Sequence, residues 1–251
     1  MKNILAVYKP VGITPLEAVM RYKQKHPQYR TKKMSYPGRL DPMAEGVLVL
    51  LAGEDTKKMI SFMKHDKEYV ADILLGLSTD TLDILGMPVK GDAGVIDEKL
   101  LKKKIKSFKG NYQQKIPAYS SIRVKGKPLF YYARRGEIDD VEVPTNNVKI
   151  QDISILDVYT ISAQRLLKEL IKKISLLSGD FRQEEIIAAW KQLLEVSSEK
   201  FTVAHVKINC SSGTYIRAIA RDVGKEYGGG MLINLKRTRV GDVGVKDCER
   251  I

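Results

Sequence analysis

The order of the predicted strands and helices is the feature that most constrains the fold of this chain. Alternating or continuous apolar runs predict strands, and apolar residues three and four positions apart predict helices. The strand-like segments are 4–7, 47–52, 67–75, 141–155 and 203–210. The helix-like segments begin near Pro15, cover 55–63, 97–108 and 164–177, and begin again after Asp180 and near Tyr215. These elements do not alternate as regular βαβ units, which supports an α+β fold over a doubly wound parallel sheet.

Local signals indicate where some of these elements begin and which stretches are loops. Thr14, Pro15 and Glu17 form a capping-box pattern, which predicts a helix that starts near Pro15. Residues 23–37 lack apolar periodicity and are expected to form an exposed basic loop. Residues 111–136 mix polar residues, proline and glycine, and we expect extended segments and turns there.

Two consecutive helix-like segments interrupt the strands at about residues 161–200. In the first, Leu166 and Ile174 are among the apolar residues that share one helical face. We expect Asp180 and Gln183 to cap the second helix. The pattern therefore predicts a helical hairpin inserted between two strands. Its apolar faces could pack on each other, on the sheet or on a partner, and we favour packing within the chain.

The composition of the chain excludes several classes of protein. No apolar run approaches the roughly 20 residues that cross a bilayer, and the N-terminal MKNILAVYKP is too short for a signal peptide. We therefore expect a cytosolic protein that is not inserted in a membrane. Two cysteines and three scattered histidines favour neither a disulfide scaffold nor a metal site. The 43 Lys and Arg exceed the 30 Asp and Glu, which gives a formal net charge of +13. This charge favours a polyanionic partner, nucleic acid first and an anionic membrane surface second, although a basic surface without such a partner has the same charge.

Three residues have surroundings that suggest chemistry. Asp41 lies in the glycine-bracketed loop 38–46, where a scaffold can hold a carboxylate, although a turn residue before proline has the same pattern. Arg217 lies near a predicted helix start, where a carboxylate partner would explain it, but an exposed arginine is the ordinary alternative. Tyr69 lies on a predicted strand beside charged residues, which suits either stacking on a base or simple packing.

Taken in order along the chain, these segments resemble the TruB family of pseudouridine synthases. The matching motifs are Lys9-Pro10-Val11-Gly12-Ile13-Thr14, then Leu40-Asp41-Pro42-Met43-Ala44-Glu45-Gly46-Val47-Leu48 with 53–57, then Lys67-Glu68-Tyr69 with Leu75-Gly76 and Thr79-Asp80-Thr81, then 116–121 with 133–134, and finally 210–217. The resemblance covers nearly the whole chain except residues 161–200.

The resemblance implies an enzyme that isomerises a uridine in folded RNA, by default the uridine at position 55 in the T loop of tRNA. The glycosidic bond is broken, the uracil rotates, and C5 is joined to the sugar, with no cofactor and no metal. It implies that Asp41 is the essential catalytic residue, as nucleophile or base, and that Arg217 pairs with it. Tyr69 is then expected to stack on the target base and assist proton removal from C5. Leu235 resembles the apolar wall of the uracil pocket.

The resemblance also implies a pseudouridine synthase fold, in which helices flank a mixed, largely antiparallel sheet with a central RNA-binding cleft. The histidine that usually precedes the catalytic motif is replaced here by Tyr36, and the residue before Leu40 is Arg39. We expect Tyr36 and Arg39 to take over the filling of the gap that a flipped base leaves in the RNA. We also expect Lys9 and Tyr215 to contact the RNA.

The end of the chain differs from most family members, which continue into a small RNA-binding PUA domain. We expect one catalytic domain over residues 1–251, interrupted by the helical hairpin and without a PUA domain. We further expect a monomer that binds tRNA without a guide RNA. A rival interpretation is an RNA-binding or tRNA-folding protein that has kept the scaffold and lost turnover. The altered Tyr36 and Arg39 favour this rival, whereas the intact Asp41 counts against it.

Overall fold

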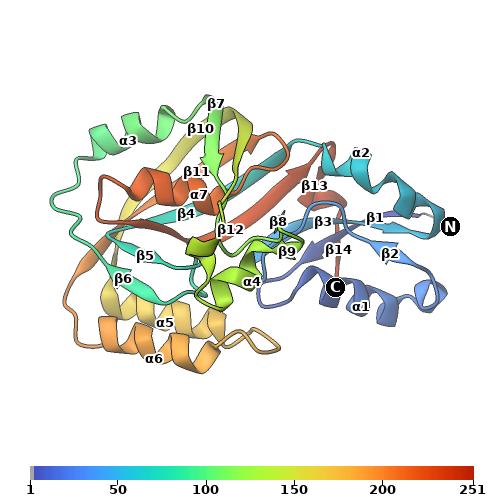
Figure 1. Ribbon diagram of the computed structural model, residues 1–251, viewed down its shortest axis with the longest axis horizontal. Coiled ribbons are helices and arrows are strands. Elements are labelled where there is room, and N and C mark those ends of the chain that lie inside the picture. The colour runs from blue at the N-terminus through green and yellow to red at the C-terminus, as the bar shows by residue number, and fades with distance from the viewer. Residues whose placement is uncertain (1–2) are drawn as a thin grey trace.

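The structure is a computed structural model that describes residues 3–251, and it is built on one ten-stranded sheet (Figure 1). The strand order is β14-β1-β3-β12-β4-β11-β10-β7, with β2 beside β3 and β13 beside β12. The β1–β14 and β3–β12 pairs are parallel, and the other pairs are antiparallel. The strands of this sheet are β1 (Ile4–Lys9), β2 (Met34–Ser35), β3 (Ala44–Ala52), β4 (Lys67–Leu75), β7 (Gly110–Lys115), β10 (Thr145–Ser162), β11 (Lys200–Cys210), β12 (Gly230–Val240), β13 (Val243–Gly244) and β14 (Glu249–Arg250). The expected α+β fold with a mixed, largely antiparallel sheet is confirmed.

Helices cover both faces of the sheet. They are α1 (Pro15–Lys25), α2 (Met59–Met63), α3 (Glu98–Lys106), α4 (Leu129–Arg134), α5 (Ala163–Ile174), α6 (Gln183–Leu194) and α7 (Ile216–Gly224). Side chains alternate along β4, so that Ala71 and Ile73 pack in one cluster with α3 and α7, whereas Leu74 packs in another with α5 and α6. Figure 1 shows α5 and α6 below the sheet and α3 above it. Two separate hairpins are formed by β5 (Leu77–Thr79) with β6 (Pro88–Lys90) and by β8 (Arg123–Val124) with β9 (Lys127–Pro128).

The predicted cap of α1 is correct, but the predicted cap of α6 is wrong. The Thr14 hydroxyl accepts the Glu17 amide at 3.1 Å, and the Glu17 carboxylate accepts the Thr14 amide at 2.7 Å. At α6 the N-cap residue is Arg182, whose φ of 62° is left-handed and whose side chain caps nothing. Asp180 instead accepts the backbone amide of Arg182, and Gln183 accepts that of Phe181, both in the turn before the helix. Neither side chain therefore caps the first amides of α6.

The helical hairpin is present between β10 and β11, and its apolar faces pack within the chain as expected. Leu166 and Ile174 of α5 join Trp190 of α6 in one core cluster with residues of β4, β11 and β12. Trp190 is completely buried, and its indole nitrogen donates to the Ile84 carbonyl at 3.3 Å. The hairpin is therefore an integral layer of the protein, and its apolar stripes are not a free docking surface.

Several local expectations need correction. Residues 53–58 form a 3₁₀ turn that precedes the short α2, where one helix over 55–63 was expected, and Ile60 is 72% exposed. Within the expected loop 23–37, Tyr29 is buried because it packs against α1. Helix α4 was not predicted, because its aromatic and basic sequence lacks apolar periodicity. No helix within residues 3–251 is long and apolar enough to cross a membrane.

Candidate active site

Asp41 lies in the loop that connects β2 to β3, where β3 begins to pair with β12. Gly46 of β3 lies beside Arg237 of β12 in the parallel register. A β-carbon on Gly46 would lie 2.1 Å from the Arg237 carbonyl oxygen, and its φ of +112° is one that side chains disfavour. Glycine therefore lets the two backbones meet closely just after the loop, which fixes the position of Asp41 against the sheet.

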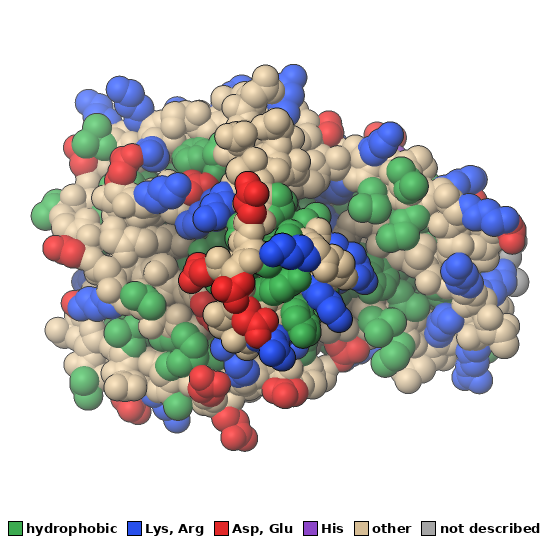
Figure 2. All heavy atoms as spheres, in the orientation of Figure 1, with side chains coloured by type: hydrophobic (Ala, Val, Ile, Leu, Met, Phe, Trp, Pro, Cys, Tyr) green, Lys and Arg blue, Asp and Glu red, His purple; other side chains and the backbone are tan. Residues whose placement is uncertain are grey.

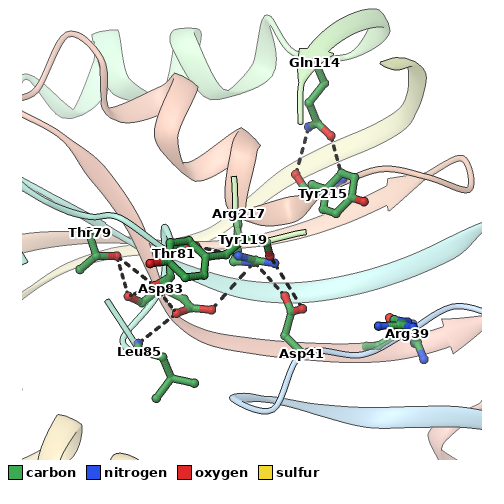
Figure 3. Close-up of polar contacts among 11 residues, drawn as sticks. Arg39, Asp41, Thr79, Thr81, Asp83, Leu85, Gln114, Tyr119, Tyr215 and Arg217 are labelled. Carbon is green, nitrogen blue, oxygen red and sulfur yellow. Dashed lines mark hydrogen bonds and ion pairs between the residues drawn. The ribbon is translucent and has the colours of Figure 1, made fainter. Parts of the chain in front are cut away.

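Asp41 forms a two-point ion pair with Arg217, as the sequence predicted (Figure 3). The Nε atom of Arg217 lies 2.8 Å from Oδ2 of Asp41, and Nη2 lies 3.3 Å from Oδ1. The side chain of Arg217 is 6% exposed, whereas that of Asp41 is 37% exposed. The carboxylate is thus held by a buried cation while remaining open to a substrate.

The other donors of Arg217 are also satisfied. Nη1 donates to the Thr81 carbonyl at 2.7 Å, and Nη2 donates to the Tyr119 carbonyl at 3.2 Å. The Asp83 carboxylate lies 3.9 Å from Nε and accepts the Thr81 hydroxyl at 2.8 Å. The sequence analysis missed Asp83 and Tyr119 as parts of this site. Asp83 lies two residues after the matched motif at 79–81, and Tyr119 lies within the matched motif at 116–121. These positions were the sequence signal that could have indicated both residues.

Burial and neighbouring charges shift the pKa values of Asp83 and Arg217 in opposite directions. Burial raises the pKa of Asp83 above its ordinary value, and the Arg217 guanidinium offsets only part of that increase. Burial lowers the pKa of Arg217, but the carboxylates of Asp41 and Asp83 more than compensate and leave it raised. The guanidinium therefore remains charged and acts on Asp41 from a fixed position.

Arg237 holds one side of the Asp41 loop. Its side chain comes from β12, is almost completely buried, and donates from Nη1 to the Arg39 carbonyl and from Nη2 to the Gly38 carbonyl, both at 3.2 Å. Its Nε donates to the Val47 carbonyl at 2.8 Å. The sequence analysis did not identify Arg237, because nothing in the sequence shows that an arginine of β12 reaches backbone carbonyls of the 38–46 loop.

Lys9 holds the other side of the same loop, and this corrects its expected contact with RNA. The Lys9 ammonium donates to the carbonyls of Pro10 at 2.9 Å, Ile13 at 2.8 Å and Pro42 at 3.2 Å, and the residue is fully buried. Burial lowers the pKa of Lys9 to about 7, while the Asp41 carboxylate acts in the opposite direction. An enclosed ammonium with three protein acceptors braces the loop and does not face an RNA.

A small cavity opens beside Asp41. Its lining residues are Asp41, Met43, Ala44, Asp83, Ile84, Arg217, Leu232, Ile233, Asn234 and Leu235. Leu235 therefore lies where an apolar wall of a base pocket was expected. A more open depression lies between 75–76, 90–94 and 199–202 and contains none of the predicted site residues. The charged groups converge on the small cavity, which makes it the candidate site.

The two expected tyrosines of the site have different surroundings. Tyr69 is 7% exposed, packs in one cluster with Leu40 and Ala44, and is absent from the cavity lining. Burial raises the pKa of Tyr69 above its ordinary value. Tyr215 is half-buried, and its backbone is fixed by reciprocal hydrogen bonds of 2.8 and 3.0 Å with the Gln114 amide (Figure 3). Stacking of Tyr69 on a base and contact of Tyr215 with RNA stay predictions.

Tyr36 and Arg39 are not gathered into one group by the structure. Tyr36 is partly buried and packs against the cluster that contains Val7 and Tyr22. Arg39 is exposed, and Figure 3 shows it apart from Asp41, with no contact drawn between the two residues. Arg39 is free to meet an RNA, whereas Tyr36 would have to leave its packing first. Their joint role in base flipping stays a prediction.

The surface beside the site combines basic and aromatic side chains. Arg134 lies over the Phe130 ring at 5.6 Å, and Lys127 and Arg135 lie over the Tyr131 ring at 5.3 and 5.5 Å. These residues belong to β9, α4 and the position after α4. Figure 2 shows Lys and Arg side chains around the hollowed middle of one face. Such a mixture suits RNA, because cations bind phosphates and aromatic rings stack on bases.

Among residues 3–251, no group of three or more His, Cys, Asp or Glu is arranged to hold a metal ion. The chemistry that the cavity itself offers is that of a carboxylate. Asp41 can act as a nucleophile or accept a proton. Arg217 and Asp83 set the charge around it.

Comparisons with known proteins place these features in one family. The family model described as TruB family pseudouridylate synthase (N terminal domain) matches residues 25–174. The tRNA pseudouridine synthase B of Desulfotalea psychrophila is 32% identical over 249 residues, which are 98% of this chain and 85% of that protein. The proteins of the same name from Clostridium tetani and Bacteroides thetaiotaomicron are 34% and 30% identical, over 98% of this chain and 70% and 88% of theirs.

A solved structure shares the fold. A chain from the structure of an H/ACA RNP bound to a substrate RNA containing 2′-deoxyuridine has a TM-score of 0.57 and 18% identity to this chain. The match covers 98% of this chain and 50% of that chain. This similarity supports a common architecture for the sheet and its helices.

Proposed function

The chain belongs to the TruB family of pseudouridylate synthases, and we propose that it converts the uridine at position 55 of tRNA to pseudouridine. It is thus an isomerase whose substrate is tRNA, as the names of its relatives indicate for those proteins. The observation that carries the proposal is the exposed Asp41 carboxylate, held by the buried Arg217 at a cavity lined by Leu235.

Asp41 is the reacting group in this proposal. Its carboxylate attacks the sugar or removes a proton from it, and the bond between the sugar and N1 of uracil breaks. The freed uracil turns against Leu235, and C5 bonds to the sugar as the carboxylate leaves the sugar again or returns the proton that it removed. C5 loses its proton and N1 gains one, so the product is an isomer of the substrate. We assign assistance at C5 to Tyr69, and orientation of the carboxylate to Arg217.

The target base must leave its stack before Asp41 can reach the sugar. We propose that the exposed Arg39 helps to hold the flipped conformation, and that the basic and aromatic surface around α4 binds the surrounding RNA. In this proposal the protein acts as a monomer in the cytoplasm and binds tRNA without a guide RNA. The formal net charge of +13 supports affinity for a polyanion.

Mapping the modified nucleotide tests the proposed target. A tRNA transcript is incubated with the protein, treated with a carbodiimide that marks pseudouridine, and copied by reverse transcription. We expect one stop that marks position 55, and none in a transcript with cytidine at that position. Modification at another uridine would contradict the target while leaving the enzyme class intact. No modification of any RNA, with tRNA binding retained, would favour a binding or RNA-folding protein.

A further inference from the structure

The helical hairpin reaches the candidate active site through Lys173 of α5. The Lys173 ammonium donates to the Ile233 carbonyl at 3.0 Å and to the side-chain oxygen of Asn234. Both acceptors belong to β12, and both residues line the cavity beside Asp41. A cation of the hairpin therefore contacts the wall of the cavity directly.

Strand β12 is irregular at this contact. Opposite β4, Leu232 pairs with Ile73 and Asn234 pairs with Asp72, so Ile233 is an additional residue that forms a β-bulge. A bulge interrupts the ladder of hydrogen bonds between strands and leaves the extra residue unpaired. Lys173 supplies a donor to the carbonyl of this extra residue.

The bulge determines which face of the sheet Leu235 occupies. Leu232 and Leu235 both pack against the cluster that contains Leu40, whereas Ile233 packs with the hairpin. In a regular strand, residues three positions apart would point to opposite faces. The additional residue therefore returns Leu235 to the face that carries the Asp41 loop.

The surroundings of Lys173 form a polar network on the hairpin side of β12. The amide of Asn234 donates to Asp72 at 2.6 Å, and the other oxygen of Asp72 lies 2.5 Å from Nδ1 of His205. Burial lowers the pKa of Lys173, while the carboxylates of Glu169 and Asp72 act in the opposite direction. These carboxylates and the bulge carbonyl together explain why a half-buried lysine is accommodated here.

We propose that Lys173 is a positioning residue for the isomerisation, because it fixes the bulge of β12 and thereby holds Leu235 beside Asp41. The kinetic consequence rests on the proposed function, whereas the effect on the bulge depends only on the geometry. The hairpin then contributes to the shape of the active site, in addition to covering one face of the sheet.

Kinetics of three variants test the first part. Lys173→Met removes the donor, Lys173→Arg restores a cation, and Lys172→Met is the matched control on an exposed neighbour in the same helix. We expect Lys173→Met to slow single-turnover release of tritium from C5-labelled tRNA about tenfold, with unchanged affinity for tRNA. Lys173→Arg should recover most of the rate, and Lys172→Met should match the wild type. Equal rates for Lys173→Met and Lys172→Met would overturn the proposal.

A double-mutant cycle separates positioning from a general loss of stability. If Lys173 acts through Leu235, Lys173→Met should slow the Leu235→Ala variant by much less than it slows the wild type. Fully additive losses would contradict the proposal, because they would mean that the two residues act independently.

Hydrogen exchange tests the bulge without any need for activity. Amides of residues 232–237 should exchange faster in Lys173→Met than in Lys172→Met, and unchanged exchange would overturn the proposal. If the wild type releases no tritium, the proposed function fails, but the exchange result still decides the role of Lys173. Should Lys173→Met not fold, Lys173→Leu, which also removes the donor, replaces it in both measurements.

Discussion

At the scale of single residues, the candidate site combines one exposed carboxylate with cations that the protein encloses. Arg217 binds the carboxylate of Asp41, while Arg237 and Lys9 bind carbonyls on the two sides of its loop. Buried cations are stable only where acceptors surround them, and here each has several. The loop is therefore held in one conformation before any substrate binds, which is what a precisely aimed carboxylate requires.

The variant Asp83→Asn tests how charge is shared around Arg217. The amide keeps the shape and can still accept the Thr81 hydroxyl, but Asp41 alone then balances the guanidinium. A carboxylate that carries the full attraction of the cation is a weaker nucleophile and base. We expect the single-turnover rate to fall about tenfold, equivalent to ~1.4 kcal/mol in the barrier, with unchanged tRNA binding in a filter assay. An unaltered rate, matching the exposed control Asp157→Asn, would contradict this role.

Lys9 should make the stability of the protein depend on pH. Its pKa falls from 10.5 in the unfolded chain to about 7 in the folded protein. Between these values the unfolded chain holds the additional proton, so the free energy of unfolding rises with pH, by up to ~1.4 kcal/mol per unit. Urea unfolding at pH 6.5 and 8.5 should therefore show the wild type gaining stability relative to Lys9→Met. A difference between the two proteins that stays constant with pH would contradict the assignment.

The Asp41–Arg217 pair was expected from the family resemblance, whereas the position of Arg217 near a helix start indicated only that some carboxylate could lie nearby. The sequence did not predict Arg237, because backbone carbonyls carry no sequence signal. The expectation for Lys9 was wrong for a related reason. A lysine in a basic chain resembles a phosphate ligand, and only the folded loops reveal the three carbonyls that enclose its ammonium.

At the scale of elements, the site depends on where β3 and β12 meet. Their parallel pairing begins at Ala44 and Leu235, directly after the Asp41 loop and directly after the bulge at Ile233. One element therefore positions the Asp41 carboxylate and the other positions the Leu235 side chain. The contact between the two strands sets the distance between those groups.

Gly46→Ala tests this contact. The added methyl group would collide with the Arg237 carbonyl, at a backbone angle that alanine disfavours. We expect a loss of ~2–4 kcal/mol in the free energy of unfolding together with reduced activity. In the control Gly244→Ala the new atom would meet nothing closer than 3.6 Å. Thermal unfolding of both variants checks the prediction, and equal stability would contradict it.

The sequence predicted these elements unevenly. Strands with clear apolar patterns, such as β4, were located well, and the capping box at Thr14 placed the start of α1 correctly. The bulge at Ile233 could not be predicted, because it arises from pairing with β4 and from the distant Lys173. The cap of α6 was misplaced because Asp180 and Gln183 bind amides of the preceding turn, which the spacing alone does not reveal.

At the scale of the whole molecule, the Asp41 carboxylate of this strongly basic protein lies beside the basic and aromatic surface around α4. The fold was predictable from the resemblance and from the irregular order of strands and helices. The apolar stripes of the hairpin predicted packing within the chain, but they did not distinguish packing on the sheet from packing of the two helices on each other.

Catalysis of uridine isomerisation in tRNA is assigned above to Asp41. The direct measurement is tritium release from tRNA labelled at uridine C5, comparing the wild type with Asp41→Asn, alongside tRNA binding at several salt concentrations. We expect release by the wild type alone, and similar, salt-sensitive binding by both proteins. Release by Asp41→Asn at the wild-type rate, or no release by either protein despite tight binding, would contradict the claim.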